Sequence, residues 1–353
     1  MIKARGYAAK HSFSSLKPFE FERDDPKDNE LQIDVHYCGV CHSDVHQVKN
    51  EWKNTIYPCL PGHEIVGIVT QAGASVTKFK VGDRVGVGCM IDSCHTCQSC
   101  SEGLEQYCES EQGFLATYNS HQRKPTKEHH TFGGYSNIVI VREDFVLHIP
   151  ESLNSPNAAP LLCAGVTTYS PMRYWNVGEG SKVGIIGLGG LGHIAIKIAK
   201  ALGAEVTAIT SSPEKIDIAF SLGASHVVQS DNEAEMKAYS NKLDFILSTI
   251  PQPHDANPYF SLLKRDGVLT IVGCIAPLKS PLDLSKILID RKSLGTSLIG
   301  GIAETQEVLN FCAQHNIFAD IKIIPMAQIN EAFDEIDHGE ISYRYVIDMS
   351  TLD

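Results

Sequence analysis

A glycine-rich turn between an apolar strand and a helix constrains the fold of this chain most. The run KVGII (182–186) precedes the turn, and the helical run HIAIKIAKALG (193–203) follows it. In such a strand–turn–helix unit, glycines let the backbone and the helix N-terminus approach a pyrophosphate group. The segment predicts a dinucleotide site, with a purely structural turn as the alternative. The turn consists of Gly187, Leu188, Gly189, Gly190, Leu191 and Gly192.

The two halves of the chain have different strand patterns. After residue 180, runs such as AEVTAIT (204–210) and LDFILSTI (243–250) alternate with helical stretches, which is typical of a parallel sheet covered on both faces. Before it, runs such as LQIDVHYCGV (31–40) are separated by turns, which indicates a mostly β domain. A chain of 353 residues also exceeds the size of a single core, about 250–300 residues. We therefore expect an α/β protein with two domains.

Local signals predict where several elements end. The strand at 204–210 should end near Thr210, because Ser212 and Pro213 suit a helix start and Gly223 suits a helix end. The segment 301–315 has helical periodicity. The tail then returns to strand-like runs at KIIP (322–325) and YRYVID (343–348).

Four closely spaced cysteines form the second strong motif. In CHTCQSCSEGLEQYC (94–108) the thiols can surround Zn²⁺ as a tetrahedron with Zn–S bonds of about 2.3 Å, which leaves no open coordination position. Such a centre holds a polar loop in shape and has no catalytic role. Reduced cysteines without a metal and an iron–sulfur cluster are the alternatives. The expected ligands of this structural zinc are Cys94, Cys97, Cys100 and Cys108.

Charge, hydropathy and cysteine content narrow the function classes. The net charge of −12 includes no basic block, which argues against nucleic acid and anionic membranes as partners. We also expect no membrane span and no targeting segment. Eleven cysteines without a secretion signal favour thiols and metal ligands over disulfides, so we expect a cytoplasmic protein. Small buried residues are expected at Cys38, Cys59, Cys89, Cys274 and Cys312.

The end of the strand at 204–210 bears on the choice of cofactor. An NAD site places a carboxylate near this point to bind the ribose hydroxyls, whereas this chain has Ser211 and Ser212 there. Glu205 lies too early and Glu214 too late for that role. The two hydroxyls and Lys215 would instead suit the 2′-phosphate of NADP(H). A plain Ser-Ser-Pro helix cap is the alternative.

Further metal-ligand residues lie far apart in the sequence. Cys41 lies in CGVCHSDVHQ (38–47), His63 and Glu64 lie in PGHE (61–64), and Cys163 lies in LLCAG (161–165). Two cysteines and a histidine are a known ligand set of catalytic zinc, which leaves a fourth position for water or substrate. The residues alone do not decide between this site and a buried core cysteine at position 163.

Nearly the whole chain resembles the zinc-dependent medium-chain alcohol dehydrogenases, and most closely their cinnamyl alcohol dehydrogenase-like branch with its bacterial NADPH-dependent aldehyde reductases. The resemblance implies a GroES-like, mostly β catalytic domain at 1–155 and 294–353 with two zinc sites, and a doubly wound Rossmann domain at 156–293. The motifs that carry it are CGVCHSDVH, YPCLPGHEIVG, GLEQYC, APLLCAGVTTYSP, GLGGLGH and SLIGG.

The resemblance also implies roles for residues around the catalytic zinc. It makes Cys41, His63 and Cys163 the zinc ligands, and Glu64 an alternate fourth ligand when the substrate position is vacant. Ser43 would contact the substrate oxygen, and His46, one helical turn further, would form the outer end of a proton relay. Asp44 would orient His63, with a solvated helix-start acid as the alternative. The resemblance further implies that Thr167 and His42 contact the cofactor and that Trp52 and Leu298 contact the substrate.

Two departures from the plant enzymes bear on the substrate. Plant members that act on cinnamyl alcohols have a tryptophan where this chain has Ala116 and a phenylalanine where it has Leu298. We therefore expect a broad pocket for aromatic and aliphatic aldehydes.

Together these features predict an oxidoreductase that interconverts primary alcohols and aldehydes, mainly by reducing aldehydes with NADPH. We expect two zinc ions per chain, one catalytic and one structural, and a homodimer formed through the segment GTSLIGG (295–301). An NAD-dependent alcohol or polyol dehydrogenase and a non-catalytic dinucleotide-binding redox sensor are the alternatives.

Overall fold

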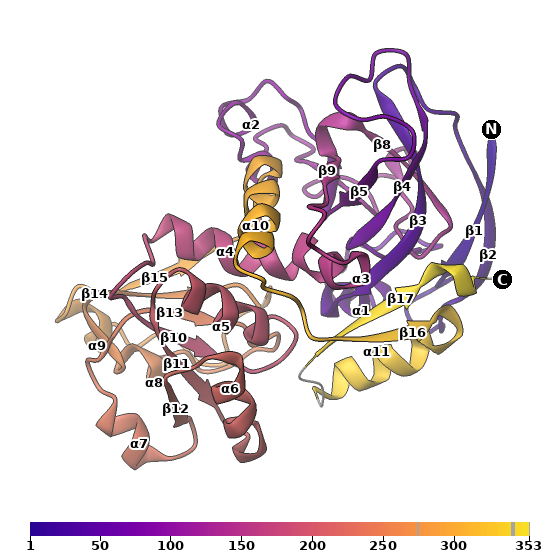
Figure 1. Cartoon of the computed structure of the whole chain (residues 1–353). Helices are drawn as coiled ribbons and strands as arrows, with labels where there is room; N and C mark the ends of the chain where they lie inside the picture. The colour runs from indigo at the N-terminus through magenta and orange to yellow at the C-terminus, as the bar shows by residue number, and fades with distance from the viewer. Residues whose placement is uncertain (274, 340–342, 353) are drawn as a thin grey trace. The chain divides into compact units, whose positions relative to one another are not determined.

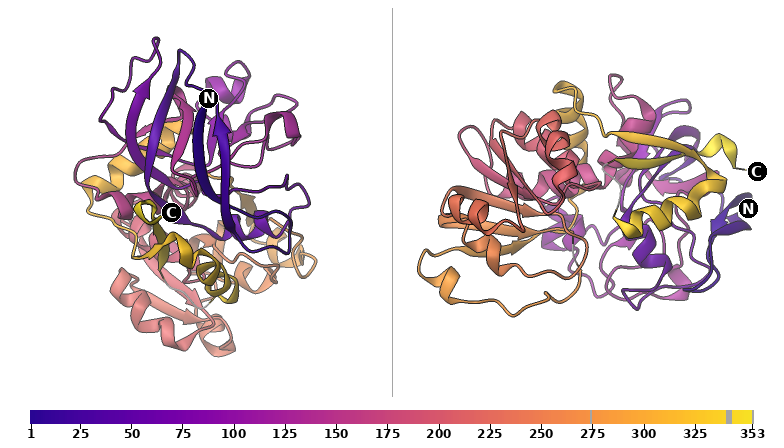
Figure 2. Two further views of the ribbon diagram at one scale, coloured as in Figure 1. Left: turned by 90° about the vertical axis from the view of Figure 1, so that its right-hand side faces the viewer. Right: turned by 90° about the horizontal axis from the view of Figure 1, so that it is seen from below.

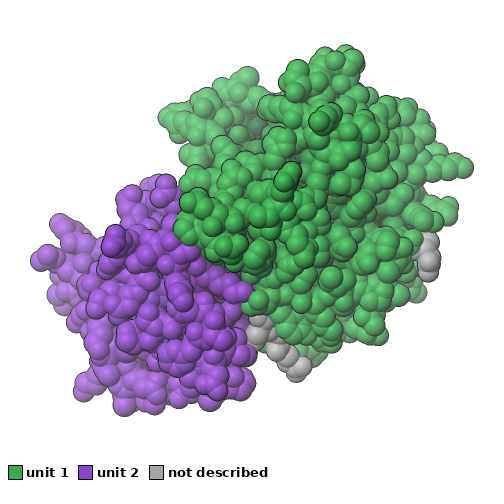
Figure 3. Space-filling view, in the orientation of Figure 1, with its two compact units in different colours: residues 1–166, 299–353 green, residues 167–298 purple. Residues whose placement is uncertain are grey.

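The protein divides into two compact units. The computed structural model describes residues 1–273, 275–339 and 343–352. Unit 1 comprises Met1–Val166 and Ile299–Asp353, and unit 2 comprises Thr167–Leu298 (Figure 3). The division falls later in the chain than the boundaries 155/156 and 293/294 given by the sequence, because the chain stays packed in unit 1 until the first turn of helix α4 (Ala164–Tyr174).

Unit 2 is built on a six-stranded parallel sheet in the order β12-β11-β10-β13-β14-β15. Counted from β10, this is the strand order 3-2-1-4-5-6 of a Rossmann domain, as the sequence predicts. The second strand ends at Thr210, which confirms that prediction. The strands are β10 (Lys182–Ile186), β11 (Glu205–Thr210), β12 (His226–Gln229), β13 (Leu243–Ser248), β14 (Leu263–Ile271) and β15 (Ser293–Thr296).

One apolar core of unit 2 lies between the sheet and the helices that follow β12, and it includes Met236 and Phe260. The element after β11 corrects one expectation: it begins with a 3-10 turn, Pro213–Lys215, and the Ser212 side chain makes no capping hydrogen bond. Its end is as predicted, because Gly223 has a φ of 111°, a left-handed conformation that glycine adopts without strain. The helices are α5 (Gly192–Ala201), α6 (Ile216–Leu222), α7 (Glu233–Ala238), α8 (Asn257–Phe260) and α9 (Ser285–Leu288).

Unit 1 contains a seven-stranded sheet in which the two ends of the chain meet. The order is β16-β17-β3-β4-β5-β9, and β8 pairs with the other part of β3. Figures 1 and 2 show the yellow C-terminal segment against the indigo strands of the N-terminal part. Both predicted tail strands are present. The strands are β3 (Glu30–Val40), β4 (Ile65–Ala72), β5 (Arg84–Val87), β8 (Ile138–Arg142), β9 (Leu147–His148), β16 (Ile321–Pro325) and β17 (Arg344–Asp348).

Strand β3 positions the first candidate site residues. Leu31, Ile33 and Val35 alternate inward along it, as expected for a strand with one face on the core. A single residue, Cys41, separates its end from helix α1 (His42–Val48). The remaining elements of unit 1 are β1 (Ile2–Ala8) paired with β2 (Lys17–Arg23), β6 (Met90–Asp92) paired with β7 (Leu115–Ala116), α1 (His42–Val48), α2 (Gln98–Ser101), α3 (Ser155–Ala158), α10 (Ile302–Gln314) and α11 (Ile329–His338).

The predicted helix at 301–315 is confirmed by α10. Among the residues that the structure describes, no helix combines the length and apolar character needed to span a bilayer.

Candidate active site

Metal-ligand side chains from three distant segments meet inside unit 1. One donor atom from each lies within 4.8 Å of the others, and all of these residues are buried. The first stands just before α1, the next two precede β4, and the last lies between the 3-10 turn Ala159–Leu162 and α4. The structure therefore brings together the whole ligand set that the sequence suggested, namely Cys41, His63, Glu64 and Cys163.

This donor set fits Zn²⁺. Thiolate sulfur and imidazole nitrogen are ligands that zinc prefers, and a carboxylate can fill the fourth position. The pKa of Cys41 is well below that of a free thiol, because the thiol of Cys163 donates a hydrogen bond to its sulfur. Burial disfavours the charged form of His63, but the neighbouring carboxylate of Asp44 outweighs it and raises the pKa of the imidazole. A metal ion bound here displaces these protons, so its affinity decreases as the pH falls.

Asp44 is the main hydrogen-bond acceptor beside this cluster. Its buried carboxylate accepts from the backbone N–H of Cys41 at 3.0 Å and of Gly62 at 3.1 Å. It also accepts from Nδ1 of His63 at 3.0 Å and from the hydroxyl of Tyr135 at 3.0 Å. An imidazole held through Nδ1 presents Nε2 to a metal. The expected contact with His63 is present, the alternative of a solvated acid is wrong, and Tyr135 is a residue that the sequence did not reveal.

Glu64 lies between the cluster and a buried arginine. Nη2 of Arg344, at the start of β17, donates to Oε1 of Glu64 at 2.5 Å and to the carbonyl of Val40 at 3.1 Å. The other carboxylate oxygen, Oε2, is buried without a hydrogen-bond partner in the described part of the chain. Burial raises the pKa of Glu64 to about 8, and the charge of Arg344 opposes this shift. Arg344 belongs to no motif in the sequence; it is one of two charged residues at the ends of a short apolar strand.

Helix α1 carries the expected relay residues. Ser43 and His46 both lie on it, and both are half-buried. Nδ1 of His46 is 2.5 Å from Oε2 of Glu51, a largely exposed carboxylate that sequence reasoning missed. Trp52 packs against His46 with ring centroids 5.7 Å apart. The imidazole is therefore held between a carboxylate and an indole ring, at the boundary between the interior and the surface.

His42 lies beside the relay. Its ring stacks on that of His46 with centroids 4.4 Å apart, and its Nε2 is 4.0 Å from Oδ1 of Asp337. Burial, followed by the neighbouring charge of His46, lowers the pKa of His42. A mostly neutral histidine with an acidic neighbour contributes little positive charge for a cofactor phosphate.

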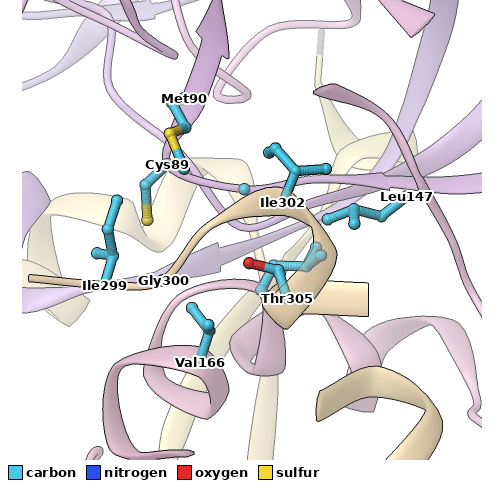
Figure 4. Close-up of a pocket in the computed structure, with 10 residues that line it drawn as sticks. Cys89, Met90, Leu147, Val166, Ile299, Gly300, Ile302 and Thr305 are labelled. Carbon is cyan, nitrogen blue, oxygen red and sulfur yellow. The ribbon is translucent and has the colours of Figure 1, made fainter. Parts of the chain in front are cut away.

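A small apolar cavity of about 10 Å³, room for about one water molecule, lies in unit 1 (Figure 4). Neither Trp52 nor Leu298, the expected substrate contacts, lines it, whereas Ile299 does. The lining residues are Gly88, Cys89, Met90, Leu147, Leu162, Val166, Ile299, Gly300, Ile302 and Thr305.

Cys89 departs from the expectation of a small buried residue. It is partly exposed and lines the cavity. It shares the hydrogen bonding of the Cys163 thiol with Cys41, and this interaction lowers the pKa of Cys89. Cys89 is thus a further sulfur atom beside the cluster. The expectation is confirmed for Cys38, Cys59 and Cys312, whereas Cys274 lies outside the described residues.

The four-cysteine loop forms the second cluster. The sulfur atoms of Cys94, Cys97, Cys100 and Cys108 lie within 4.8 Å of one another. The Sγ atoms of Cys94 and Cys100 are 4.0 Å apart, close to the edge of about 3.8 Å expected for a tetrahedron with zinc–sulfur bonds of about 2.3 Å. Backbone N–H groups of Thr96 and Cys97 lower the pKa of Cys94 to about 6, which favours the thiolate that a metal needs. The cluster fits Zn²⁺.

The glycine turn of unit 2 is shaped for close approach by a ligand. Gly187, directly after β10, has a φ of 90°. A Cβ atom on Gly192 would lie 1.9 Å from the carbonyl oxygen of Gly187, so no larger residue fits there. A Cβ atom on Gly189 would meet no atom within 4 Å, which leaves space outside the turn. Helix α5 follows, and Leu191 before it provides no side-chain cap, so its first N–H groups suit a phosphate.

The end of β11 presents no carboxylate. Glu205 lies at the start of this strand, where it pairs with Lys182 and with His226, at 3.8 and 3.0 Å. Ser211 is exposed, and Ser212 and Lys215 are half-buried. Near the N-terminal end of unit 2, the hydroxyl oxygen of Thr167 is buried without a hydrogen-bond partner in the part of the chain that the structure describes. An orphaned hydroxyl of this kind fits a contact to a bound molecule.

Comparisons with known proteins agree with this architecture. The profile of the alcohol dehydrogenase GroES-like domain matches residues 27–151, and that of the zinc-binding dehydrogenases matches residues 190–314. The aldehyde reductase YahK of Escherichia coli is 50% identical over 99% of both chains.

Two solved structures cover 100% of this chain and 99% of their own. A cinnamyl alcohol dehydrogenase of Sorghum bicolor has a TM-score of 0.93 and 42% identity. The cinnamyl alcohol dehydrogenase of Helicobacter pylori, solved with NADP(H), has a TM-score of 0.90 and 39% identity. The protein is therefore an alcohol and aldehyde oxidoreductase that belongs to the zinc-dependent medium-chain alcohol dehydrogenase family, in its cinnamyl alcohol dehydrogenase-like branch.

Proposed function

We propose that this protein reduces aromatic and aliphatic aldehydes to primary alcohols with NADPH at a catalytic zinc ion. The observation that carries the proposal is the convergence of the donor atoms of Cys41, His63 and Cys163, with Glu64 as an exchangeable fourth donor. The test is a screen of aldehydes with NADPH and NADH, together with the zinc content per chain. Turnover of both benzaldehyde-like and medium aliphatic aldehydes is expected, and turnover of one narrow polyol alone would contradict the proposal.

The protein's own side chains have three tasks in this reaction. A bound zinc ion would polarise the substrate oxygen, and NADPH would supply the hydride. Ser43 then passes a proton to the substrate oxygen as charge develops on it, and His46 replaces that proton. Glu51, hydrogen-bonded to His46 and largely exposed, takes protons from water and passes them inward. Asp44 keeps His63 in the orientation that metal binding requires.

The cofactor proposal rests on the end of β11. Ser211, Ser212 and Lys215 offer two hydroxyls and a positive charge to a 2′-phosphate, and Glu205 is engaged at the other end of the strand. The relative solved with NADP(H) supports the same choice. Ser211→Asp should reduce kcat/KM for NADPH about tenfold or more, because a carboxylate repels the phosphate, and should spare NADH. Ser211→Asn, of similar size and uncharged, is the matched control.

A screen of aldehydes with both cofactors and the zinc content per chain separate the proposed function from its two alternatives. A preference for NADH would favour an NAD-dependent alcohol or polyol dehydrogenase. A chain that binds a dinucleotide but holds one zinc ion and turns over no aldehyde would favour a redox sensor. Two zinc ions per chain and NADPH-dependent turnover support the proposal, in which the structural ion is bound by the four-cysteine loop.

We propose that two copies associate through strand β15. This strand is the last in the sheet of unit 2, so one of its edges is unpaired in the described structure. Exposed apolar side chains lie close to it in sequence, at Leu284, Leu288, Ile289 and Leu294. A homodimer is expected by light scattering, and Leu288→Glu should shift it toward the monomer. A cytoplasmic location and the absence of nucleic-acid and membrane partners stay predictions.

A further inference from the structure

The four-cysteine loop is in direct contact with the helix that lines the apolar cavity. In Figure 1, α10 lies beside the loop that carries α2, and both belong to unit 1. The contact is made by Glu105, which lies between the third and fourth cysteines, and by the first residues of α10.

The carboxylate of Glu105 takes the place of an N-cap side chain at the start of α10. The residue before the helix is Gly301, which has no side chain with which to cap it. Oε2 of Glu105 accepts a hydrogen bond from the backbone N–H of Ile302 at 3.0 Å. A carboxylate at this point satisfies an otherwise unpaired helix donor and is favoured by the helix dipole. The start of α10 is therefore capped by a residue 197 positions earlier in the chain.

The backbones also meet at this point. A Cβ atom on Gly301 would lie 1.8 Å from the carbonyl oxygen of Gly103 and 2.8 Å from Oε2 of Glu105. Gly103 itself donates to the carbonyl of Cys100 at 3.2 Å, within the metal loop. Only glycine at position 301 allows the helix to begin this close to the loop.

The residues on either side of this contact form a wall of the cavity. Ile299, Gly300, Ile302 and Thr305 all line it (Figure 4). A Cβ atom on Gly300 would lie 2.3 Å from Cγ2 of Val166 on the neighbouring wall, so there is little room for displacement. A small shift of the first turn of α10 changes the shape of the cavity directly.

We infer that Glu105 is a positioning residue through which the four-cysteine loop fixes the first turn of α10, and with it the wall of the cavity. The loop thus sets the shape of the cavity without lining it, and we expect this shape to affect substrate binding. This inference deepens the proposed function. Its predicted effect on KM rests on that function, whereas its predicted effect on hydrogen exchange does not.

The test compares Glu105→Ala with Glu105→Gln and with Glu109→Ala. Glutamine keeps an acceptor oxygen for the Ile302 N–H. Glu109 lies in the same loop and accepts from Ser99, through its N–H at 3.2 Å and its hydroxyl at 2.7 Å, so Glu109→Ala removes hydrogen bonds of the loop but not the contact with α10. The readouts are amide hydrogen exchange over 301–306, zinc content, and kinetics with short and bulky aldehydes.

In Glu105→Ala, exchange over 301–306 should become about tenfold faster, while zinc content and exchange in β3 stay unchanged. KM for bulky aldehydes should change about threefold or more, with kcat within about twofold. Glu105→Gln should restore both values, and Glu109→Ala should match the wild type. Gly301→Ala, which blocks the contact from the helix side, should reproduce the effect of Glu105→Ala.

Unchanged exchange over 301–306 in both Glu105→Ala and Gly301→Ala would overturn the inference. Faster exchange that appears only together with zinc loss or with faster exchange in β3 would overturn it as well, because the carboxylate would then serve the stability of the loop or of the whole unit. Failure of the proposed function would instead remove aldehyde turnover from every variant and from the wild type, and would leave the exchange result standing.

Discussion

Arg344 donates a hydrogen bond to Glu64 at 2.5 Å across a separation of 280 positions in the chain. Both side chains are almost completely buried, and strand β17 brings the arginine beside the end of β3. Burial raises the pKa of Glu64 to about 8, and the charge of Arg344 opposes this shift. Without the arginine, burial would raise the pKa of this carboxyl further.

The first prediction concerns this pair. Arg344→Leu should lower the free energy of unfolding by about 3–5 kcal/mol, because Glu64 is left buried without its partner. The double variant Arg344→Leu with Glu64→Gln should recover part of this loss, since a neutral amide is less costly to bury. Urea unfolding of the three proteins measures both effects. Equal stability of the single and double variants would argue against a coupled pair.

The second prediction concerns Asp44. Asp44→Asn should weaken zinc binding at the Cys41 cluster about 10- to 100-fold, because an amide cannot accept all of the hydrogen bonds that the carboxylate accepts. After dialysis against a weak chelator, one zinc ion per chain should remain instead of two. Tyr135→Phe, which removes a single donor, should have a smaller effect. Loss of both ions from Asp44→Asn would indicate general unfolding instead.

The third prediction concerns the relay. His46→Gln should lower kcat for aldehyde reduction about 10- to 100-fold at neutral pH, because the proton on the product oxygen then has no nearby source. Added imidazole should restore part of the activity of His46→Gln, since it can deliver protons from solution. Glu51→Gln should lower kcat less, because His46 is partly exposed and can still exchange protons with water directly. The variant Glu109→Gln, in the metal loop, serves as the control.

The fourth prediction concerns pH and stability. Burial is the largest cause that lowers the pKa of His121 and of His130. Nδ1 of His121 and Nε2 of His130 are buried without a hydrogen-bond partner in the described part of the chain. A histidine in the unfolded chain has a pKa of about 6.5 and takes up a proton below that pH. In the folded protein the pKa of each imidazole is lower, so both stay neutral there while the unfolded chain is protonated. Their contribution to stability is present above that pH and decreases below it.

Urea unfolding at about pH 7.5 and about pH 5.5 measures this effect. The wild type should lose stability at the lower pH, and His121→Asn and His130→Asn should each lose less. Protonation of the metal clusters destabilises all three proteins equally, so it cancels in the comparison. An identical loss in all of them would show that these histidines do not contribute.

Much of the fold and the ligand set could be predicted because the signals are local. The glycine turn at 187–192 and the cysteines at 94–108 follow fixed spacings within one segment, and the ends of β11 and α6 follow from Thr210 and Gly223. The convergence of Cys41, His63 and Cys163 was suggested by resemblance, since they are separated by up to 122 positions.

The missed residues are contacts that only the folded chain creates. Tyr135, Arg344 and Glu51 each hold a candidate site residue, but none of them belongs to a motif with fixed spacing. Cys89 was expected in the core because cysteine is usually a small buried residue, and nothing in its neighbours marks the cavity that it lines. Ser212 was expected to cap a helix, but the chain forms a 3-10 turn there and the hydroxyl is left unused by the helix.

The pairing of β17 with β3 has a consequence for biosynthesis. Val40 and Cys38 of β3 pair with Tyr345 and Ile347, so the strand that ends just before Cys41 gains this neighbour only after strand β17 has been made. A nascent chain can fold the four-cysteine loop early, because that loop is contiguous in sequence, whereas the strand that leads to Cys41 waits for a partner about 300 positions later. We therefore expect the four-cysteine loop to reach its final structure earlier in synthesis than the end of β3 beside Cys41.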